Sequence, residues 1–176
     1  SKSPAVFDMA KLRWMNGEYI RKMPPEKFHE TASQYYSKTL PDKGIDTFRL
    51  SRLLQPRTEV FSDIPSMIDF IENLPDYDIS LYEHKKSKTD SAISLTSLKA
   101  ALPVLEKTEP WENDALYSAL TGLANEMGMK NSQILWPVRT ALSGKAATPG
   151  GATELAELLG RDETVRRIMK GIEKLS

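Results

Sequence analysis

Hydrophobic residues recur every three to four positions along most of the chain, which is the spacing of one face of an α-helix. We predict helices over residues 8–23, 25–36, 46–56, 64–74, 95–105, 110–127, 130–143, 148–159 and 162–175. We find no run of alternating β-branched residues, the pattern of a half-buried strand. The sequence therefore predicts an all-α fold of roughly eight to ten helices.

Glycine, proline and aspartate mark the ends of several predicted helices. Gly128, Gly144 and Gly160 each follow an apolar stripe, where a residue in the left-handed conformation commonly ends a helix. Asp8 is expected to cap the first helix. Pro137 lacks an amide hydrogen and clashes with the carbonyl four residues earlier. It therefore either lies in a first turn or kinks the helix that ends at Gly144.

Composition narrows the class of protein. The chain has 176 residues, of which 40% are hydrophobic and 27% charged, and this is ordinary for a globular protein. No apolar run approaches the roughly twenty residues of a membrane span. The absence of cysteine excludes disulfides and thiolate sites and is compatible with the cytoplasm. We therefore expect a cytoplasmic chain with no membrane partner.

Charge is unevenly distributed. The formal net charge is zero, which by itself argues against nucleic-acid binding. However, residues 1–38 carry seven Lys/Arg against four Asp/Glu, and residues 129–176 carry eight against five. Residues 61–78 hold five acids and no Lys or Arg. Two basic ends therefore flank an acidic middle, so the net charge alone does not exclude RNA.

Residues 136–151 join a basic side chain, a basic loop and a predicted helix start. Arg139 lies on stiff helical backbone, Lys145 follows Gly144, and Thr148 opens the next predicted helix. Cations beside a helix N-terminus suit an anionic or polar ligand. The same arrangement is also common on solvated surfaces, so these residues alone leave both interpretations open.

Signatures of catalysis are missing. We find no phosphate-binding glycine loop, dinucleotide fingerprint, zinc-protease helix or nucleophile elbow. The two histidines, His29 and His84, lie far apart in sequence and offer little for a metal site or a Ser-His-Asp triad. Tryptophans can stack on bases; we expect Trp111 in the core and leave Trp14 and Trp136 open between the two roles.

Several motifs resemble one family of RNA-binding enzymes. They are Phe7-Asp8 with Trp14-Met15-Asn16-Gly17, Gln55-Pro56-Arg57, Trp136-Pro137-Val138-Arg139, and the stretch from Glu154 to Arg167. Their order and spacing are similar to the region of bacterial glutamyl-tRNA synthetases that follows the catalytic domain. The first and last motifs are specific, and the resemblance covers essentially the whole chain.

The resemblance implies an architecture and a partner. It implies a stem-contact segment over residues 1–40, followed by anticodon-binding subdomains over residues 41–90 and 91–176. The implied partner is tRNA(Glu), and the implied state is a monomer. The ATP-binding signatures of the family precede the matched region. ATP and Mg²⁺ would therefore serve the full-length ligase, and we expect neither a cofactor nor catalysis in this chain.

The resemblance also implies site residues. Arg57 matches the family position that reads the third anticodon base, where arginine goes with preference for the glutamate tRNA. An arginine fork can hydrogen-bond a base edge or stack on a splayed base. The residues expected at the anticodon are Arg57, Arg139, Thr148, Lys145 and Gln133, the last two by proximity only. Those expected at the tRNA stem, on backbone phosphates, are Lys11, Arg13, Asn16 and Lys22.

Two alternatives remain beside these expectations. Arg57 can instead be a cation that interacts with the carbonyls at the end of a helix. The chain as a whole can instead be a non-catalytic helical protein-interaction module, which its zero net charge and the acidic 61–78 segment would suit.

Overall fold

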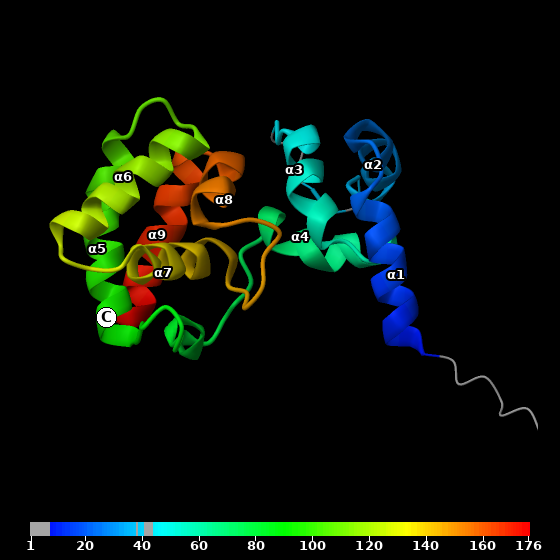
Figure 1. Cartoon of the computed structure of the whole chain (residues 1–176). Coiled ribbons are helices and arrows are strands. Elements are labelled where there is room, and N and C mark those ends of the chain that lie inside the picture. Colours follow the sequence, from blue (N-terminus) through cyan, green and yellow to red (C-terminus); the bar gives the residue numbers. More distant parts are fainter. Residues whose placement is uncertain (1–7, 38, 41–43) are drawn as a thin grey trace, which may run out of the picture. The chain divides into compact units, whose positions relative to one another are not determined.

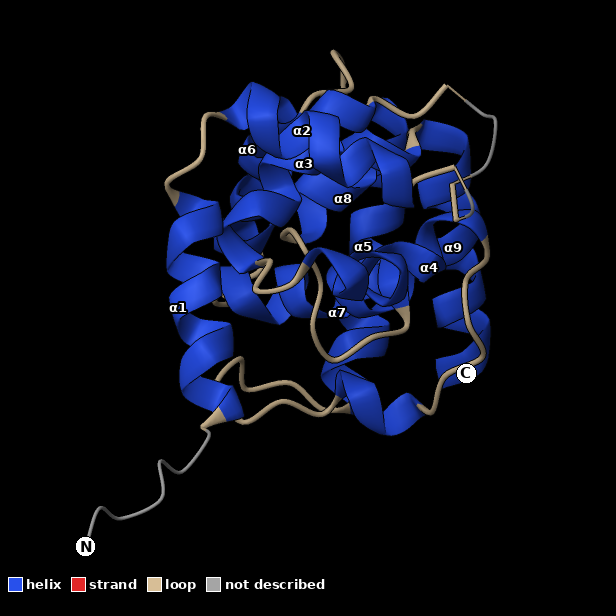
Figure 2. Cartoon of the chain, turned by 90° about the vertical axis from the view of Figure 1, so that its right-hand side faces the viewer, coloured by secondary structure: helices blue, strands red, loops and turns tan. Residues whose placement is uncertain are grey.

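The computed structural model describes residues 8–37, 39–40 and 44–176, and these residues form helices joined by loops (Figure 1). In the described ranges the only β-type pairing is an isolated bridge between His84 and Thr89, and Figure 2 accordingly shows helices without strands. The all-α prediction is confirmed. The chain divides into two compact units, residues 1–69 and 70–176. The three-part division expected from the sequence remains a prediction.

Unit 1 is built from short helices. They are α1 (Met9–Arg21), α2 (Pro25–Ala32), η1 (Ser33–Tyr35), α3 (Thr47–Leu54), η2 (Gln55–Arg57), η3 (Phe61–Asp63) and α4 (Ile64–Glu72), which continues past the unit boundary. Asp8 caps α1 as predicted, because its carboxylate accepts a hydrogen bond from the Lys11 N–H at 3.2 Å. Pro25 begins α2, where the missing N–H costs nothing.

The core of unit 1 contains a polar network around Ser51. Aliphatic and aromatic side chains of α1 to α4, with Tyr36 at the end of η1, fill the interior: Ile20, Phe28, Ala32, Tyr36, Leu50, Leu54, Ile64 and Ile68. Among them, the Ser51 hydroxyl lies 2.6 Å from the Tyr36 hydroxyl and 2.7 Å from His29 Nδ1. Burial raises the pKa of Tyr36 to about 12. The phenol therefore stays neutral and adds no charge to this network.

Unit 2 is a larger helical bundle. It contains η4 (Ile79–Tyr82), α5 (Ser91–Lys107), α6 (Asn113–Glu126), α7 (Asn131–Ser143), α8 (Ala152–Leu159) and α9 (Arg161–Leu175). Helix α5 packs against α9, α7 and α6, and α7 packs against α8 (Figure 1). Within the described part of the chain, no helix combines the length and the apolar character that a membrane crossing requires.

Helix α7 and the loop after it position the residues singled out from the sequence. The helix begins at Asn131, so Pro137 lies in its interior and not in a first turn. It ends at Gly144, whose φ of +61° is the predicted left-handed ending. The next helix, α8, begins at Ala152, later than the predicted start at Thr148. Gly151 is its N-cap residue.

Candidate nucleic-acid interface

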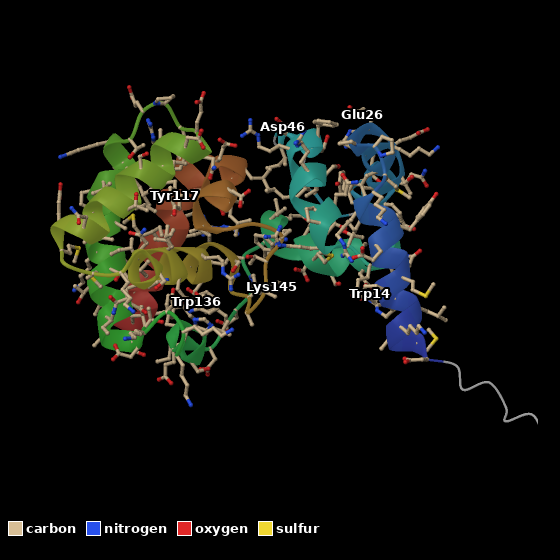
Figure 3. The ribbon with its side chains drawn as sticks, viewed as in Figure 1. Trp14, Glu26, Asp46, Tyr117, Trp136 and Lys145 are labelled. Carbon is tan, nitrogen blue, oxygen red and sulfur yellow. The ribbon has the colours of Figure 1, made fainter. Side chains whose placement is uncertain are left out.

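Unit 2 contains a pocket of about 690 Å³ at the N-terminal ends of three helices. The first turns of α6, α7 and α8 all contribute to its lining. Aromatic side chains join them from α6 and α7, and Tyr117 and Trp136 are labelled in Figure 3. The lining residues are Ser87, Asn113, Asp114, Tyr117, Asn131, Ser132, Leu135, Trp136, Arg139, Gly151, Ala152, Thr153 and Glu154.

The helix starts around the pocket already have hydrogen-bond partners. The backbone N–H groups of Lys130, Gly151 and Asn113 donate to the side chains of Gln133, Glu154 and Glu157. These caps offset part of the positive field that an open helix N-terminus presents. Asp114 and Glu154 add negative charge to the lining. The caps and the two carboxylates therefore make the pocket poorly suited to a small free anion.

Trp136 is held by contacts on its ring and on its nitrogen. Its Nε1–H donates to the Leu81 carbonyl at 3.0 Å. The His84 ring stacks on it, with centroids 3.7 Å apart and planes 7° apart, and the Arg139 guanidinium carbon lies 4.4 Å from its centroid. Trp136 is therefore ordered by its own chain. Tyr117, which is 47% exposed, is the more accessible aromatic side chain of the pocket.

Arg139 and Thr148 lie together, as the sequence led us to expect of neighbouring site residues. Arg139 Nη1 donates to Thr148 Oγ1 at 3.1 Å, and Nη2 donates to the Ala146 carbonyl at 2.6 Å. Thr148 Oγ1 in turn donates to the Gly150 carbonyl at 2.6 Å. The guanidinium thus fastens the loop after α7 to the helix, and it also lines the pocket.

Gln133 and Lys145 do not line the pocket. Gln133 uses its side chain within the fold, because Oε1 caps Lys130 and Nε2 donates to the Lys88 carbonyl at 3.0 Å. Lys145 follows Gly144 on the loop after α7 (Figure 3), and its backbone N–H donates to Ser143 Oγ at 3.2 Å. The expectation that these two residues contact the anticodon rests on their nearness in sequence to Arg139 and Thr148, and it remains a prediction.

Arg57 lies on an anchored segment of unit 1. It belongs to η2, where the buried Gln55 side chain donates to the Ile20 and Met23 carbonyls at 3.0 and 2.9 Å. Arg57 is exposed, and its Nη1 donates to the Leu53 carbonyl at 3.2 Å. The bond to a helix carbonyl fits the interpretation of Arg57 as a cation at a helix end. Its exposed position fits the interpretation of Arg57 as a residue that contacts a base. Both interpretations therefore stand.

The four residues expected at the tRNA stem fall into two pairs. Arg13 donates hydrogen bonds to Glu59 at 3.2 Å and to Asp63. The bond to Asp63 is the main reason why the pKa of Arg13 is raised. Asn16 donates to the Glu59 carbonyl. These two residues tie α1 to the segment before α4. Lys11 and Lys22 are exposed.

The polar residues of the pocket were missed by reading the sequence. Asn113, Asn131 and Ser132 lie in the first turns of α6 and α7, and Tyr117 lies one turn into α6. The sequence signal for these pocket residues was the presence of amides and hydroxyls near predicted helix starts. That signal is weak, because such residues commonly cap helices there. Only the tertiary packing shows that three of these starts meet at one pocket.

The described residues include no group of three or more His, Asp or Glu side chains that could hold a metal ion.

A helical bundle whose pocket presents aromatic and amide groups is suited to unpaired bases, and comparison with known proteins places it in a class. The chain belongs to the anticodon binding domain family, whose model matches residues 5–172.

Curated relatives of this chain are glutamate–tRNA ligases. The chain is 53% identical over 175 residues to the glutamate–tRNA ligase of Clostridium acetobutylicum and 50% identical over 175 residues to that of Clostridium tetani. Each match covers 99% of this chain and 36% of the relative, so the chain spans about a third of the length of these ligases.

Solved structures support the fold. A crystal structure of a glutamate tRNA ligase from Elizabethkingia meningosepticum, in complex with its amino acid, superposes with a TM-score of 0.79 at 22% identity. The match covers 99% of this chain and 34% of that one. A glutamate-tRNA synthetase from Elizabethkingia anophelis gives a TM-score of 0.71 at 20% identity, over 97% and 33% of the two chains.

Proposed function

We propose that this chain is the tRNA-binding part of a glutamate–tRNA ligase and recognises the anticodon loop of tRNA(Glu). The observation that carries the proposal is its 53% identity, over 99% of its length, to a glutamate–tRNA ligase. In the full-length ligase, glutamate would be attached to tRNA with ATP and Mg²⁺, and this chain would contribute binding alone. It would act in the cytoplasm and as a monomer.

The pocket of unit 2 supports recognition of a single-stranded loop. Unpaired bases can be splayed out, stacked on aromatic rings and hydrogen-bonded on their edges. Tyr117 offers an exposed ring, and Asn131 offers an amide that can pair with a base edge. Arg139 adds a positive charge to the pocket and fixes the loop that carries Thr148. Lys145 and Gln133 would contribute from outside its lining.

Arg57 supplies the test of base choice. The Arg57→Gln variant should bind RNA hairpins that differ only at the third anticodon base with nearly equal affinity, whereas the wild-type chain should prefer the glutamate anticodon by about 1 to 3 kcal/mol, the value of a bidentate contact. Arg57→Lys should not restore the preference, because an ammonium group lacks the planar fork.

Fluorescence-polarisation titration of the hairpins measures this preference. The Arg166→Gln variant is a suitable control, because Arg166 is an exposed arginine on α9 whose guanidinium is paired with Glu163. An anticodon-swapped hairpin that the wild-type chain bound equally well would show the anticodon assignment to be wrong. Equal preference in the wild type and Arg57→Gln would leave anticodon binding in place and remove Arg57 from it.

One surface favours a second function, docking to a protein. Helix α1 exposes large apolar side chains, with Met9 at 59%, Trp14 at 58% and Tyr19 at 67%. Exposed apolar patches of this kind are common at protein interfaces. The chain would then be a helical protein-interaction module. Its binding to RNA would show no salt dependence attributable to phosphate contacts, and titration across a salt series separates the two functions.

A further inference from the structure

Unit 1 has a pocket of its own, of about 310 Å³, formed where four elements meet. Arg21 closes α1, Pro25 opens α2, Arg52 lies in the last turn of α3, and Gln55 and Pro56 belong to η2. We name it the Arg21–Arg52 notch. Its lining contains two arginines and no carboxylate.

The two arginines differ in how they are held. Arg21 Nε donates to Glu18 at 3.1 Å, and its Nη1 lies 3.5 Å from the Pro56 carbonyl, so its position is set by the fold. Arg52 is exposed, and no hydrogen bond or ion pair to its side chain is found among residues 8–37, 39–40 and 44–176. The notch therefore combines a braced guanidinium with one available for a ligand.

The position of each arginine at a helix end explains why a cation is favourable there, but it does not explain why the two arginines lie together. Arg21 and Arg52 each lie in the last turn of a helix, where a cation interacts favourably with the helix dipole. That account treats the two arginines separately. It does not explain why both line one hollow at the start of α2, where the dipole of a third helix also favours negative charge.

We infer that the Arg21–Arg52 notch binds a phosphate of the RNA backbone. The inference rests on the proposed function, because it needs an RNA ligand. Arg57 is the residue after Pro56 in η2, so a phosphate in the notch would belong to a nucleotide near the one that Arg57 meets. The notch positions the RNA and reads no sequence, and Gln55 keeps its wall in place by anchoring η2 to the end of α1.

Salt dependence of RNA binding tests the inference. The affinity of the whole chain for tRNA(Glu) is measured across a series of salt concentrations, for the wild type and for Arg52→Gln. A lost phosphate contact should lower the slope of log affinity against log salt by about one. The affinity should fall by the same factor for hairpins with different anticodons, because a phosphate contact carries no base preference. Arg52→Lys should keep the wild-type slope.

Arg49→Gln on the same helix is the matched control. Arg49 lies outside the notch and 3.6 Å from Asp46, so its loss should leave the slope near the wild-type value. A wild-type slope in Arg52→Gln would overturn the notch while leaving RNA binding intact. An Arg52→Gln variant with altered anticodon preference would also overturn it.

Two further outcomes distinguish the sources of failure. A wild-type chain that bound no tRNA would overturn the proposed function itself. Inorganic phosphate, titrated in the absence of RNA, separates a backbone site from a site for a small anion. Binding of inorganic phosphate that depends on Arg52, with an RNA slope that does not, would assign the notch to the small anion and overturn the inference.

Discussion

Arg167 is fully buried and makes four hydrogen bonds inside unit 2. Its Nη1 donates to the Phe70 and Leu142 carbonyls at 2.8 and 2.7 Å, and its Nη2 donates to the Ile71 carbonyl at 3.1 Å. Its Nε donates to Glu163 at 2.8 Å. The side chain has no exposed surface. A single guanidinium thus satisfies carbonyls at the ends of two helices, α4 and α7, and pairs with a carboxylate on its own helix.

The Arg167→Met variant should unfold more easily by about 3 to 5 kcal/mol, because it leaves three buried carbonyls without this donor and leaves Glu163 with Arg166 as its remaining partner. Arg166→Met is the control, since Arg166 binds the same Glu163 with 56% of its side chain exposed. Its loss should cost about 1 kcal/mol or less. Urea denaturation measures both, and equal losses in the two variants would contradict the assignment.

Glu163 should make unit 2 sensitive to acid. Hydrogen bonds from Arg166 and then from Arg167 lower the pKa of this carboxyl to about 2 from its usual 4.5. A carboxyl with a lowered pKa stabilises the folded chain fully above its unfolded pKa and loses that contribution as the pH falls. The contribution, about 2 to 3 kcal/mol, should therefore disappear between about pH 4.5 and 2.

Comparison with Glu163→Gln isolates this carboxyl from the other acids. The difference in unfolding free energy between the wild type and the variant should be constant above about pH 5 and shrink toward zero near pH 2. Glu173→Gln, on the same helix, should show no such change. A difference that stayed constant down to about pH 2 would contradict the role given to Glu163.

At the scale of helices, the apolar stripe and the buried face do not always coincide. In α9 the buried residues are Thr164, Arg167, Ile168 and Gly171, whereas Met169 is 56% exposed. In α1 only Gly17 and Ile20 are buried. Periodicity located these helices correctly but could not give their packing faces, because a buried arginine and buried glycines do not register as apolar positions.

Gly171 shows why a glycine occupies the buried face of α9. A Cβ added there would lie 2.7 Å from the Tyr82 hydroxyl and 3.1 Å from both Ala141 Cβ and Leu98 Cδ1. Gly171→Ala should gain about 1 kcal/mol of helix propensity and lose about 1 to 3 kcal/mol to overpacking. We expect net destabilisation, visible as a lower thermal midpoint.

Gly122→Ala is the matched substitution. Gly122 lies within α6, and apart from its chain neighbours and the backbone of its own helix no atom lies within 4 Å of a Cβ added there. Propensity alone then applies, so this variant should be stabilised by about 0.5 to 1 kcal/mol. A stabilised Gly171→Ala variant would show that the neighbours of Gly171 move aside at little cost.

At the scale of the whole chain, sequence reasoning succeeded where the signal was local. The all-helical fold, the cap at Asp8 and the helix end at Gly144 follow from periodicity and turn chemistry. The pairing of Arg139 with Thr148 was also within reach, since nine positions separate them across one short loop.

The rest of the candidate site depends on contacts between distant segments. The pocket of unit 2 joins Ser87, the α6 start and the α8 start, which lie far apart in sequence. Likewise, the sequence did not show that Arg13 pairs with carboxylates about fifty positions away at Glu59 and Asp63. Its contact with RNA remains a prediction. Charge read along the sequence does not show which cations the fold itself uses.

The stacking of His84 on Trp136 gives the pocket an optical property. Trp136 is one of three tryptophans, and its indole lies face to face with an imidazole and beside a guanidinium. The light that an excited indole emits depends strongly on such close neighbours. The emission of Trp136 is therefore tied to the arrangement of His84 and Arg139. The chain carries its own fluorophore at the place where a ligand would enter.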